Sequence, residues 1–308
     1  MRKLLRLIYK LRLRRPYQQI DRLHYLKRLR KDRKHKDDEW LYSDKDINQF
    51  CDGEILICST FLDSDVVFYC CPDSHIERHI IRHGLYTRHN LVFMSQFLSP
   101  GTLFIDIGAN IGAYAIPVAK AFPNIQVHAY EPHPGALGRF KRNAALNNPH
   151  NLTVFNIGIA AQSGKLTFHG FDIKDYGISS FMAPKNSENK QYDIFPVDVK
   201  SLDEIYKETD QRISLIKIDV QGYEIEVLKG AQNLIAGQRP YIFLEHEDIN
   251  FSPTEAIDIK KCLRDFFLEF GYSVFYLTRY DPNMLFPVCW ERPLDGDLIA
   301  IPDYATPL

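Results

Sequence analysis

The chain has 308 residues, of which 45% are hydrophobic and 25% charged, a composition typical of soluble globular proteins. No stretch approaches the roughly 20 consecutive apolar residues of a membrane-spanning helix, and the N-terminus lacks the apolar core of a secretory signal. We therefore expect a cytoplasmic protein. The six cysteines show neither a C-x-x-C pair nor a partnering histidine spacing, so we expect reduced thiols and no metal site.

The first 40 residues form a basic segment on an otherwise acidic chain. They contain 15 Lys/Arg against 5 Asp/Glu, whereas the whole chain has a net charge of −1. Leu4, Leu5, Ile8 and Leu11 recur at helical spacing among basic residues, which predicts a short basic amphipathic helix. Three interpretations of residues 1–35 stay open: a solvated or loosely docked arm, peripheral contact with an anionic membrane at the inner membrane face, and nucleic-acid binding. The acidic remainder argues against nucleic acid.

A small pre-domain follows this arm. Two short apolar strands are expected at residues 54–58 and 66–69, joined by a polar turn at 63–65. A helix from Ser74 to Arg82 comes next and stops at Gly84. Together with the change of texture near residue 100, these signals divide the chain into a basic N-terminal arm, a pre-domain and a main domain, at residues 1–45, 46–98 and 99–308.

The main domain shows apolar strands that alternate, in its first half, with helix-length segments. Near-continuous apolar strands are typical of a parallel sheet covered on both faces. The last two strands, with Asp281-Pro282-Asn283 in the loop between them, suggest an antiparallel hairpin at the edge. The fold class is therefore α/β, a Rossmann-like doubly wound seven-stranded sheet with its last strand antiparallel, preceded by a small α+β segment. The seven strands are predicted at residues 103–107, 127–130, 153–157, 215–218, 241–244, 273–277 and 298–301.

A glycine-containing turn follows the first strand of this sheet. Asp106, Gly108, Asn110 and Gly112 alternate with apolar residues before a helix that begins near Ala113. A dinucleotide site would need G-x-G-x-x-G to meet a pyrophosphate, and Asn110 stands where the second glycine would fall. A sulfonium amino acid offers an ammonium and a carboxylate instead, which Asp106 and backbone N–H groups can meet. The turn therefore favours a nucleoside that carries a sulfonium amino acid over a dinucleotide.

Glu131 ends the second strand, 25 positions after Asp106. At this place a carboxylate can accept both ribose hydroxyls of a bound nucleoside. The two signals together predict S-adenosylmethionine as the cofactor.

The fourth strand brings the candidate catalytic residues. Lys217 and Asp219 are two positions apart and so lie on one side of the strand, with Asp219 at its carboxyl end. Methyl transfer depends mainly on positioning, and a base is needed only when the acceptor must lose a proton. Asp219, Glu224, Glu245 and His246 are the candidates for that base, and Lys217 is expected to pair with a carboxylate such as Glu224.

Four motifs in this order resemble the FkbM family of methyltransferases, over about residues 100–250. The resemblance implies a class I methyltransferase fold, S-adenosylmethionine as the donor, and usually a hydroxyl acceptor on a sugar, polyketide or other secondary metabolite. We therefore expect a small-molecule or glycan acceptor. The motifs occupy residues 104–114, 129–134, 143–147 and 216–231.

The resemblance also implies roles for individual residues. By motif position it makes Asp219 and Glu224 active-site residues. The segments at residues 75–90, 170–182 and 245–252 are left to form the acceptor side. Cofactor contacts are expected at Asp106, Gly108, Asn110 and Glu131, with Gly112 and Asn147 in the same motifs.

Three other functions remain open. An N-methyltransferase acting on nucleic acid bases would show an Asn/Asp-Pro-Pro-aromatic turn after the fourth strand, where this chain has residues 219–222, DVQG. A protein N-methyltransferase and a non-catalytic cofactor-binding or interaction module are the second and third. An oxidoreductase is disfavoured because the phosphate-binding glycine pattern is absent.

Overall fold

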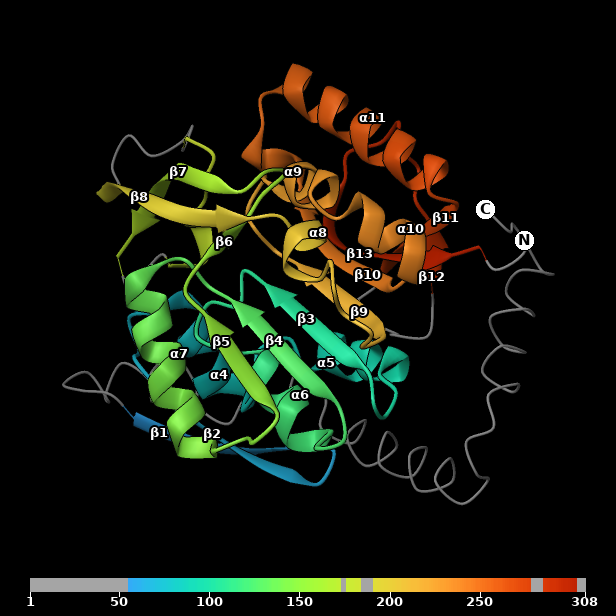
Figure 1. Cartoon of the computed structure of the whole chain (residues 1–308). Coiled ribbons are helices and arrows are strands. Elements are labelled where there is room, and N and C mark those ends of the chain that lie inside the picture. Colours follow the sequence, from blue (N-terminus) through green and yellow to red (C-terminus); the bar gives the residue numbers. More distant parts are fainter. Residues whose placement is uncertain (1–54, 173–175, 184–190, 278–284, 304–308) are drawn as a thin grey trace. The chain divides into compact units, whose positions relative to one another are not determined.

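A mostly parallel β-sheet lies between two layers of helices (Figure 1). The structure, a computed structural model, describes residues 55–172, 176–183, 191–277 and 285–303, all within the unit Trp40–Leu308. Eight strands of these described residues form the sheet: β3 (Leu103–Ile107), β4 (Gln126–Tyr130), β5 (Leu152–Phe155), β9 (Ile213–Ile218), β10 (Tyr241–Glu247), β11 (Tyr272–Leu277), β12 (Leu285–Pro287) and β13 (Asp295–Pro302). Their order across the sheet is β12-β11-β13-β10-β9-β3-β4-β5.

The strand directions confirm the predicted α/β fold class. Neighbouring strands from β5 to β10 run parallel, whereas β13 pairs antiparallel with both β10 and β11. One detail differs from the prediction of an edge hairpin, because β13 inserts between β10 and β11 and the short β12 occupies the edge. The predicted loop residues 281–283 lie outside the described residues.

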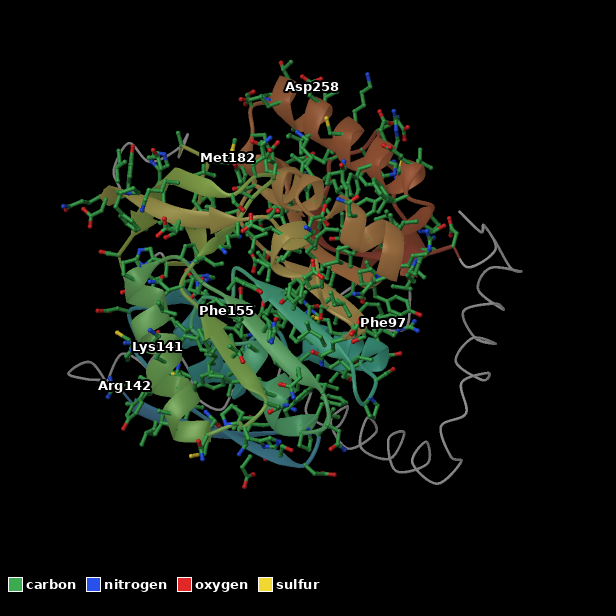
Figure 2. The ribbon with its side chains drawn as sticks, in the orientation of Figure 1. Phe97, Lys141, Arg142, Phe155, Met182 and Asp258 are labelled. Carbon is green, nitrogen blue, oxygen red and sulfur yellow. The ribbon has the colours of Figure 1, made fainter. Side chains whose placement is uncertain are left out.

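Helices cover both faces of the sheet (Figure 1). Crossovers from β3 to β5 place α6 (Ala115–Ala121) and α7 (Pro134–Asn147) on one face, and α8 (Leu202–Ile205), α9 (Glu224–Lys229), α10 (Gln232–Gln238) and α11 (Pro253–Glu269) cover the other. Alternate strand residues, among them Leu103, Ile105 and Ile107, pack in one buried cluster with α8 to α11. Charged side chains such as Lys141 and Asp258 point outward from their helices (Figure 2).

The predicted hairpin and the helix after it are both present before the main sheet. Strands β1 (Ile55–Phe61) and β2 (Ser64–Cys70) are joined through Leu62 and Asp63, whose φ values of 46° and 64° give the left-handed pair that tight hairpins prefer. The predicted turn at residues 63–65 was therefore placed slightly late. Helix α4 (His75–His83) begins after Ser74, whose side chain accepts from the backbone N–H of Glu77, and it ends at Gly84.

Two asparagines of α7 attach the hairpin to this helix. Asn147 Oδ1 accepts from the N–H of Val67 at 2.9 Å, and its Nδ2 donates to the Val67 carbonyl at 2.6 Å. Asn143 Oδ1 accepts from the N–H of Tyr69 at 2.9 Å. Because these amides satisfy backbone groups of β2, they replace the neighbouring strand that β2 lacks on this side.

A second, three-stranded sheet was not predicted. It contains β6 (Gly158–Ile159), β7 (Gly164–Phe171) and β8 (Tyr192–Lys200) in the order β6-β8-β7, with the short helix η2 (Tyr176–Ile178) beside it. Most residues of β8 are exposed or half-buried, so the apolar pattern that predicts strands is weak here. Ser180, just after η2, donates to the carbonyls of Val220 and Gln221 at 3.1 and 2.9 Å, which joins this sheet to the loop after β9.

The basic arm lies outside the described residues, together with its predicted helix and the predicted membrane contact of residues 1–35. The division of the chain at residues 45 and 98 stays a prediction. Among the described residues, no helix is long and apolar enough to cross a lipid bilayer.

Candidate active site

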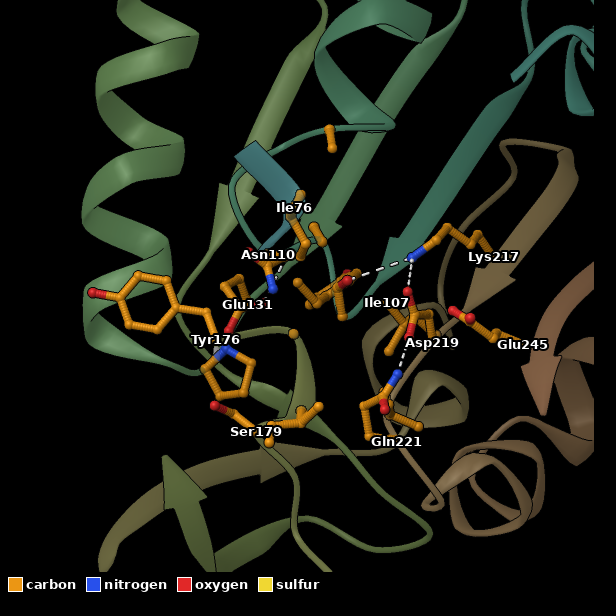
Figure 3. Close-up of a pocket in the computed structure, with 18 of the residues that line it drawn as sticks. Ile76, Ile107, Asn110, Glu131, Tyr176, Ser179, Lys217, Asp219, Gln221 and Glu245 are labelled. Atoms are coloured by element: carbon orange, nitrogen blue, oxygen red, sulfur yellow. Dashed lines mark hydrogen bonds and ion pairs between the residues drawn. The ribbon is translucent and has the colours of Figure 1, made fainter. Parts of the chain in front are cut away.

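A cavity of about 360 Å³ opens at the carboxyl ends of β3, β4 and β9 (Figure 3). In the sheet β3 has β4 on one side and β9 on the other. Strands β4 and β5 extend the sheet in one direction from β3, and the later strand β9 begins its extension in the opposite direction, so the cavity lies where the strand order reverses. Doubly wound sheets bind ligands at this point, and the volume is in the range of small-molecule sites.

The loop after β3 forms one wall of the cavity. Gly108 has φ of 72°, and a Cβ atom on it would overlap the carbonyl oxygen of Asp219. The N–H groups of Gly108 and Ala109 both donate to the Tyr130 carbonyl at 3.1 Å, which fixes the turn against β4. Asn110 continues the loop in a left-handed conformation, with φ of 51°. The loop therefore needs glycine at residue 108 and presents its backbone to the cavity.

Glu131 lies on the opposite side of this loop and faces the cavity. Its Oε2 accepts from the N–H of Asn110 and its Oε1 from the N–H of His133, both at 2.7 Å. Burial raises the pKa of Glu131 to about 7, although these two backbone hydrogen bonds lower it. Each carboxylate oxygen keeps a free lone pair, so Glu131 can still accept two hydroxyl groups.

The ammonium of Lys217 is buried beneath the cavity. Its Nζ lies 3.3 Å from Asp106 Oδ1 and 3.2 Å from Asp219 Oδ2, and it donates to the Gly108 carbonyl at 3.4 Å. The ring of Tyr114 is centred 4.8 Å from the same atom. Burial alone would lower the pKa of Lys217, but the two carboxylates raise it above its usual value, so this side chain stays charged.

Asp106 depends on this lysine. The carboxyl group is fully buried and lies behind Lys217 rather than among the residues that line the cavity. Burial raises the pKa of Asp106, and Lys217 acts in the opposite direction. The predicted pairing of Lys217 with Glu224 is wrong, because Lys217 pairs with Asp106 and Asp219.

Glu224 instead stabilises the turn after β9. Its Oε1 accepts from the N–H groups of Gly222 and Val220 at 2.9 and 3.4 Å, and the side chain is buried. Gln221 and Gly222 take left-handed φ values of 54° and 97°. The turn directs the Gln221 side chain to Asp219, where Nε2 donates to Oδ1 at 3.0 Å (Figure 3).

Strand alternation separates His246 from its neighbours. Glu245 and Glu247 line the cavity, and His246 points to the other face of β10. There His246 Nε2 lies 3.1 Å from Asp248 Oδ1, and the ring stacks on Phe251. Burial lowers the pKa of His246. The structure thus places this predicted base outside the cavity.

Two further predicted contacts, Gly112 and Asn147, also lie away from the cavity lining. A Cβ atom at Gly112 would overlap the ring of Phe140, so this glycine allows the loop to pack on α7. Asn147 makes the hydrogen bonds to Val67 described above. Of the predicted site residues, the structure brings six to the lining: Gly108, Asn110, Glu131, Lys217, Asp219 and Glu245.

The aromatic side chains of the cavity were not predicted. Tyr86 comes from the loop before α5 (Arg88–Met94) and packs edge-to-face on Tyr114, with ring centroids 6.1 Å apart. The Tyr114 hydroxyl is fixed by Thr87 Oγ1 at 2.5 Å and Asn90 Nδ2 at 3.2 Å. Isolated aromatic residues in loops carry no periodic signal. The predicted acceptor segments do reach the lining, through Tyr86, Tyr176, Ser179, Phe181 and Glu247.

The lining of the cavity is acidic. Four carboxyl groups face it, from Glu131, Asp219, Glu245 and Glu247, whereas Lys217 is the one lysine or arginine among the described lining residues. An acidic cavity attracts cations and repels phosphates. The site therefore suits a cationic ligand with vicinal hydroxyls, and it does not suit a pyrophosphate.

Comparison with known proteins agrees with this geometry. The Methyltransferase FkbM domain matches residues 106–274, which is more than half of the chain. The chain belongs to the FkbM methyltransferase family.

Relatives of known name are distant in sequence. The 2-O-methyltransferase NoeI of Sinorhizobium fredii is 28% identical over 166 residues, which cover 50% of this chain and 67% of NoeI. The hexuronic acid methyltransferase AglP of Haloferax volcanii is 29% identical over 132 residues, covering 42% of this chain and 50% of AglP. A crystal structure of methyltransferase FkbM from Methylobacillus flagellatus aligns with a TM-score of 0.42 at 20% identity, over 70% of this chain and 46% of that one.

Replacing Lys217 tests the buried ion pairs. Lys217→Met should lower the free energy of unfolding by about 3–5 kcal/mol, because it leaves the buried Asp106 without its cation. Without Lys217 the pKa of Asp106 rises further, so the folded state holds a proton that the unfolded chain releases. The deficit relative to the unmodified protein should therefore grow as pH rises above about 4.

Denaturant unfolding at several pH values measures this effect. The double variant Asp106→Asn, Lys217→Met removes both charges and should recover part of the stability and lose the added pH dependence. A deficit in Lys217→Met that is small, or equal at all pH values, would contradict the assigned pairing.

Proposed function

We propose that this protein is an S-adenosylmethionine-dependent O-methyltransferase whose acceptor is a hydroxyl group of a sugar, glycan or secondary metabolite. The observation that supports the proposal most directly is Glu131, a cavity-lining carboxylate held by two backbone N–H groups, one on each oxygen. Such a group binds the two hydroxyls of a ribose. Family membership supports methyl transfer as the reaction class.

The charge of the cavity supports the sulfonium donor. When bound, S-adenosylmethionine supplies a methyl group on a positively charged sulfur. Asp219 and Glu245 lie on the side of the cavity nearest β10, away from Glu131, and their carboxyl groups can attract that charge (Figure 3). The positive charge of Lys217 repels the sulfonium only weakly, because Lys217 is already paired with Asp106 and Asp219.

The acceptor side supports a neutral polyol. Tyr86 and Tyr176 offer aromatic faces and hydroxyls, and Ser179 and Gln221 add polar groups. The names of two relatives, a 2-O-methyltransferase and a hexuronic acid methyltransferase, favour a sugar hydroxyl. The aromatic and polar side chains would orient the acceptor, and positioning is the main source of rate enhancement in such a displacement.

Glu131 should control nucleoside affinity and its pH dependence. Glu131→Gln should weaken binding of S-adenosylhomocysteine about 10- to 100-fold, since hydrogen bonds to a charged group contribute about 1.5–3 kcal/mol. The ionised carboxylate binds the ribose, and the pKa of Glu131 in the free protein is about 7. Affinity of the unmodified protein should therefore rise about tenfold between about pH 6 and 8, and Glu131→Gln should remove that rise.

Isothermal titration of the full chain measures both effects. Asn147→Ala is the matched control, because Asn147 lies in a neighbouring motif but bonds to Val67. It should lower the free energy of unfolding by about 1–3 kcal/mol and leave affinity unchanged. Equal affinity in Glu131→Gln and the unmodified protein would refute the ribose assignment.

Methyl transfer itself is tested with carbon-13-labelled S-adenosylmethionine. The full chain is incubated with neutral oligosaccharides, chito-oligosaccharides and uronic-acid oligosaccharides, and the products are analysed by NMR. We expect a methoxy carbon signal on a sugar, and its loss in Asp219→Asn. An N-methyl product, or binding of the donor with no methylated product in any mixture, would overturn O-methylation of a glycan.

A further inference from the structure

Glu245, one of the candidate bases named from the sequence, lies beside a second carboxyl group. It follows Phe243 by two residues on β10, and Phe243 is paired with Lys217 on β9, so Glu245 lies beside Asp219 at the ends of two parallel strands. Both carboxyl groups line the cavity, and Figure 3 shows Glu245 directed toward Asp219. Two acidic side chains are therefore held next to each other in a partly buried site.

Too little positive charge surrounds this pair. The acidic groups that act on Glu245 are Asp219 just after β9, Asp297 on β13 and Glu247 on β10, and the cation that opposes them is Lys217. Asp297 is the direct cross-strand partner of Glu245. The Tyr86 hydroxyl lies in the same acidic surroundings. Like charges held side by side at strand ends do not all ionise, so the site needs either a proton or a cationic ligand.

The hydrogen bonds distinguish the two carboxyl groups. Asp219 accepts from Lys217 Nζ on Oδ2 and from Gln221 Nε2 on Oδ1. The carboxyl group of Glu245 accepts no hydrogen bond from the described residues. The Asp219 carboxylate, followed by burial, raises the pKa of Glu245 well above its usual value.

We propose that Glu245 is the proton acceptor of the methyl transfer, and that the positive charge of the bound donor first expels the proton that Glu245 otherwise holds. This inference rests on the proposed function. The sulfonium takes the place of the proton as the neutralising charge beside Asp219 and Glu245. Glu245 is therefore ionised only when the donor is in the cavity. Binding of the donor thus produces the carboxylate that accepts the proton of the acceptor hydroxyl.

The transfer step then restores the first state. A bond forms between the acceptor oxygen and the methyl carbon, and the carbon–sulfur bond breaks with its electron pair left on sulfur. The acceptor hydroxyl gives its proton to the Glu245 carboxylate. The product complex therefore has a neutral sulfur and a protonated Glu245, and the charge beside Asp219 is unchanged through the step.

The donor and its product differ in the charge on sulfur, which makes the proposal measurable without an acceptor. S-adenosylmethionine and S-adenosylhomocysteine are titrated into the full chain at about pH 7, in buffers of different ionisation enthalpy, and the slopes give the protons released on binding. The donor should release at least about half a proton more than the product. The contribution of Glu131 cancels, because both ligands carry the same ribose.

Two variants assign the released proton. Glu245→Gln should still bind both ligands but abolish the difference between them, whereas Glu247→Gln, two residues along on the same strand face, should keep it. Equal proton release by the two ligands in the unmodified protein, or a difference that persists in Glu245→Gln or disappears equally in Glu247→Gln, would overturn the proposal. Failure of S-adenosylmethionine to bind the unmodified protein would instead refute the proposed function.

Discussion

The buried ammonium of Lys217 is the interaction on which the site depends. It lies at the centre of the sheet and bridges Asp106 of β3 and Asp219 at the end of β9, at 3.3 and 3.2 Å. A buried carboxylate without a partner strongly destabilises a folded protein. The fold therefore needs Lys217 together with the carboxylates that it pairs with. The same ammonium also donates to the Gly108 carbonyl, which links the set to the loop after β3.

This arrangement separates structural charge from the charge offered to a ligand. Lys217 is paired with Asp106 and Asp219, and the carboxyl groups that line the cavity outnumber its cations. In the proposed function Glu131 would bind the ribose of the nucleoside, whereas Asp219 and Glu245 would lie near the transferred methyl group. The small sheet of β6, β7 and β8 closes the site from the side through Ser180 and the aromatic residues near η2, so an acceptor would meet uncharged groups there.

Local sequence patterns predicted the parts of this site that local chemistry decides. Gly108 lies in a turn after an apolar strand, and Glu131 lies at the end of another. Both positions can be predicted from neighbouring residues in the sequence, without knowledge of distant contacts. His246 was misplaced because β10 is apolar on both faces before it, so alternation does not show which face is the cavity. Asn147 was misassigned because its partner, Val67, is 80 residues away along the chain. Strands β7 and β8 were missed because their exposed residues carry little apolar pattern.

The central claim is that an acidic cavity at the switch point of the sheet binds a cationic nucleoside. The direct measurement is isothermal titration of the full chain with S-adenosylmethionine and, separately, with a nicotinamide dinucleotide, which also contains an adenosine but carries a negatively charged pyrophosphate instead of a sulfonium. We expect micromolar binding of S-adenosylmethionine and no detectable binding of the dinucleotide. Binding of the dinucleotide with equal or greater affinity would contradict it.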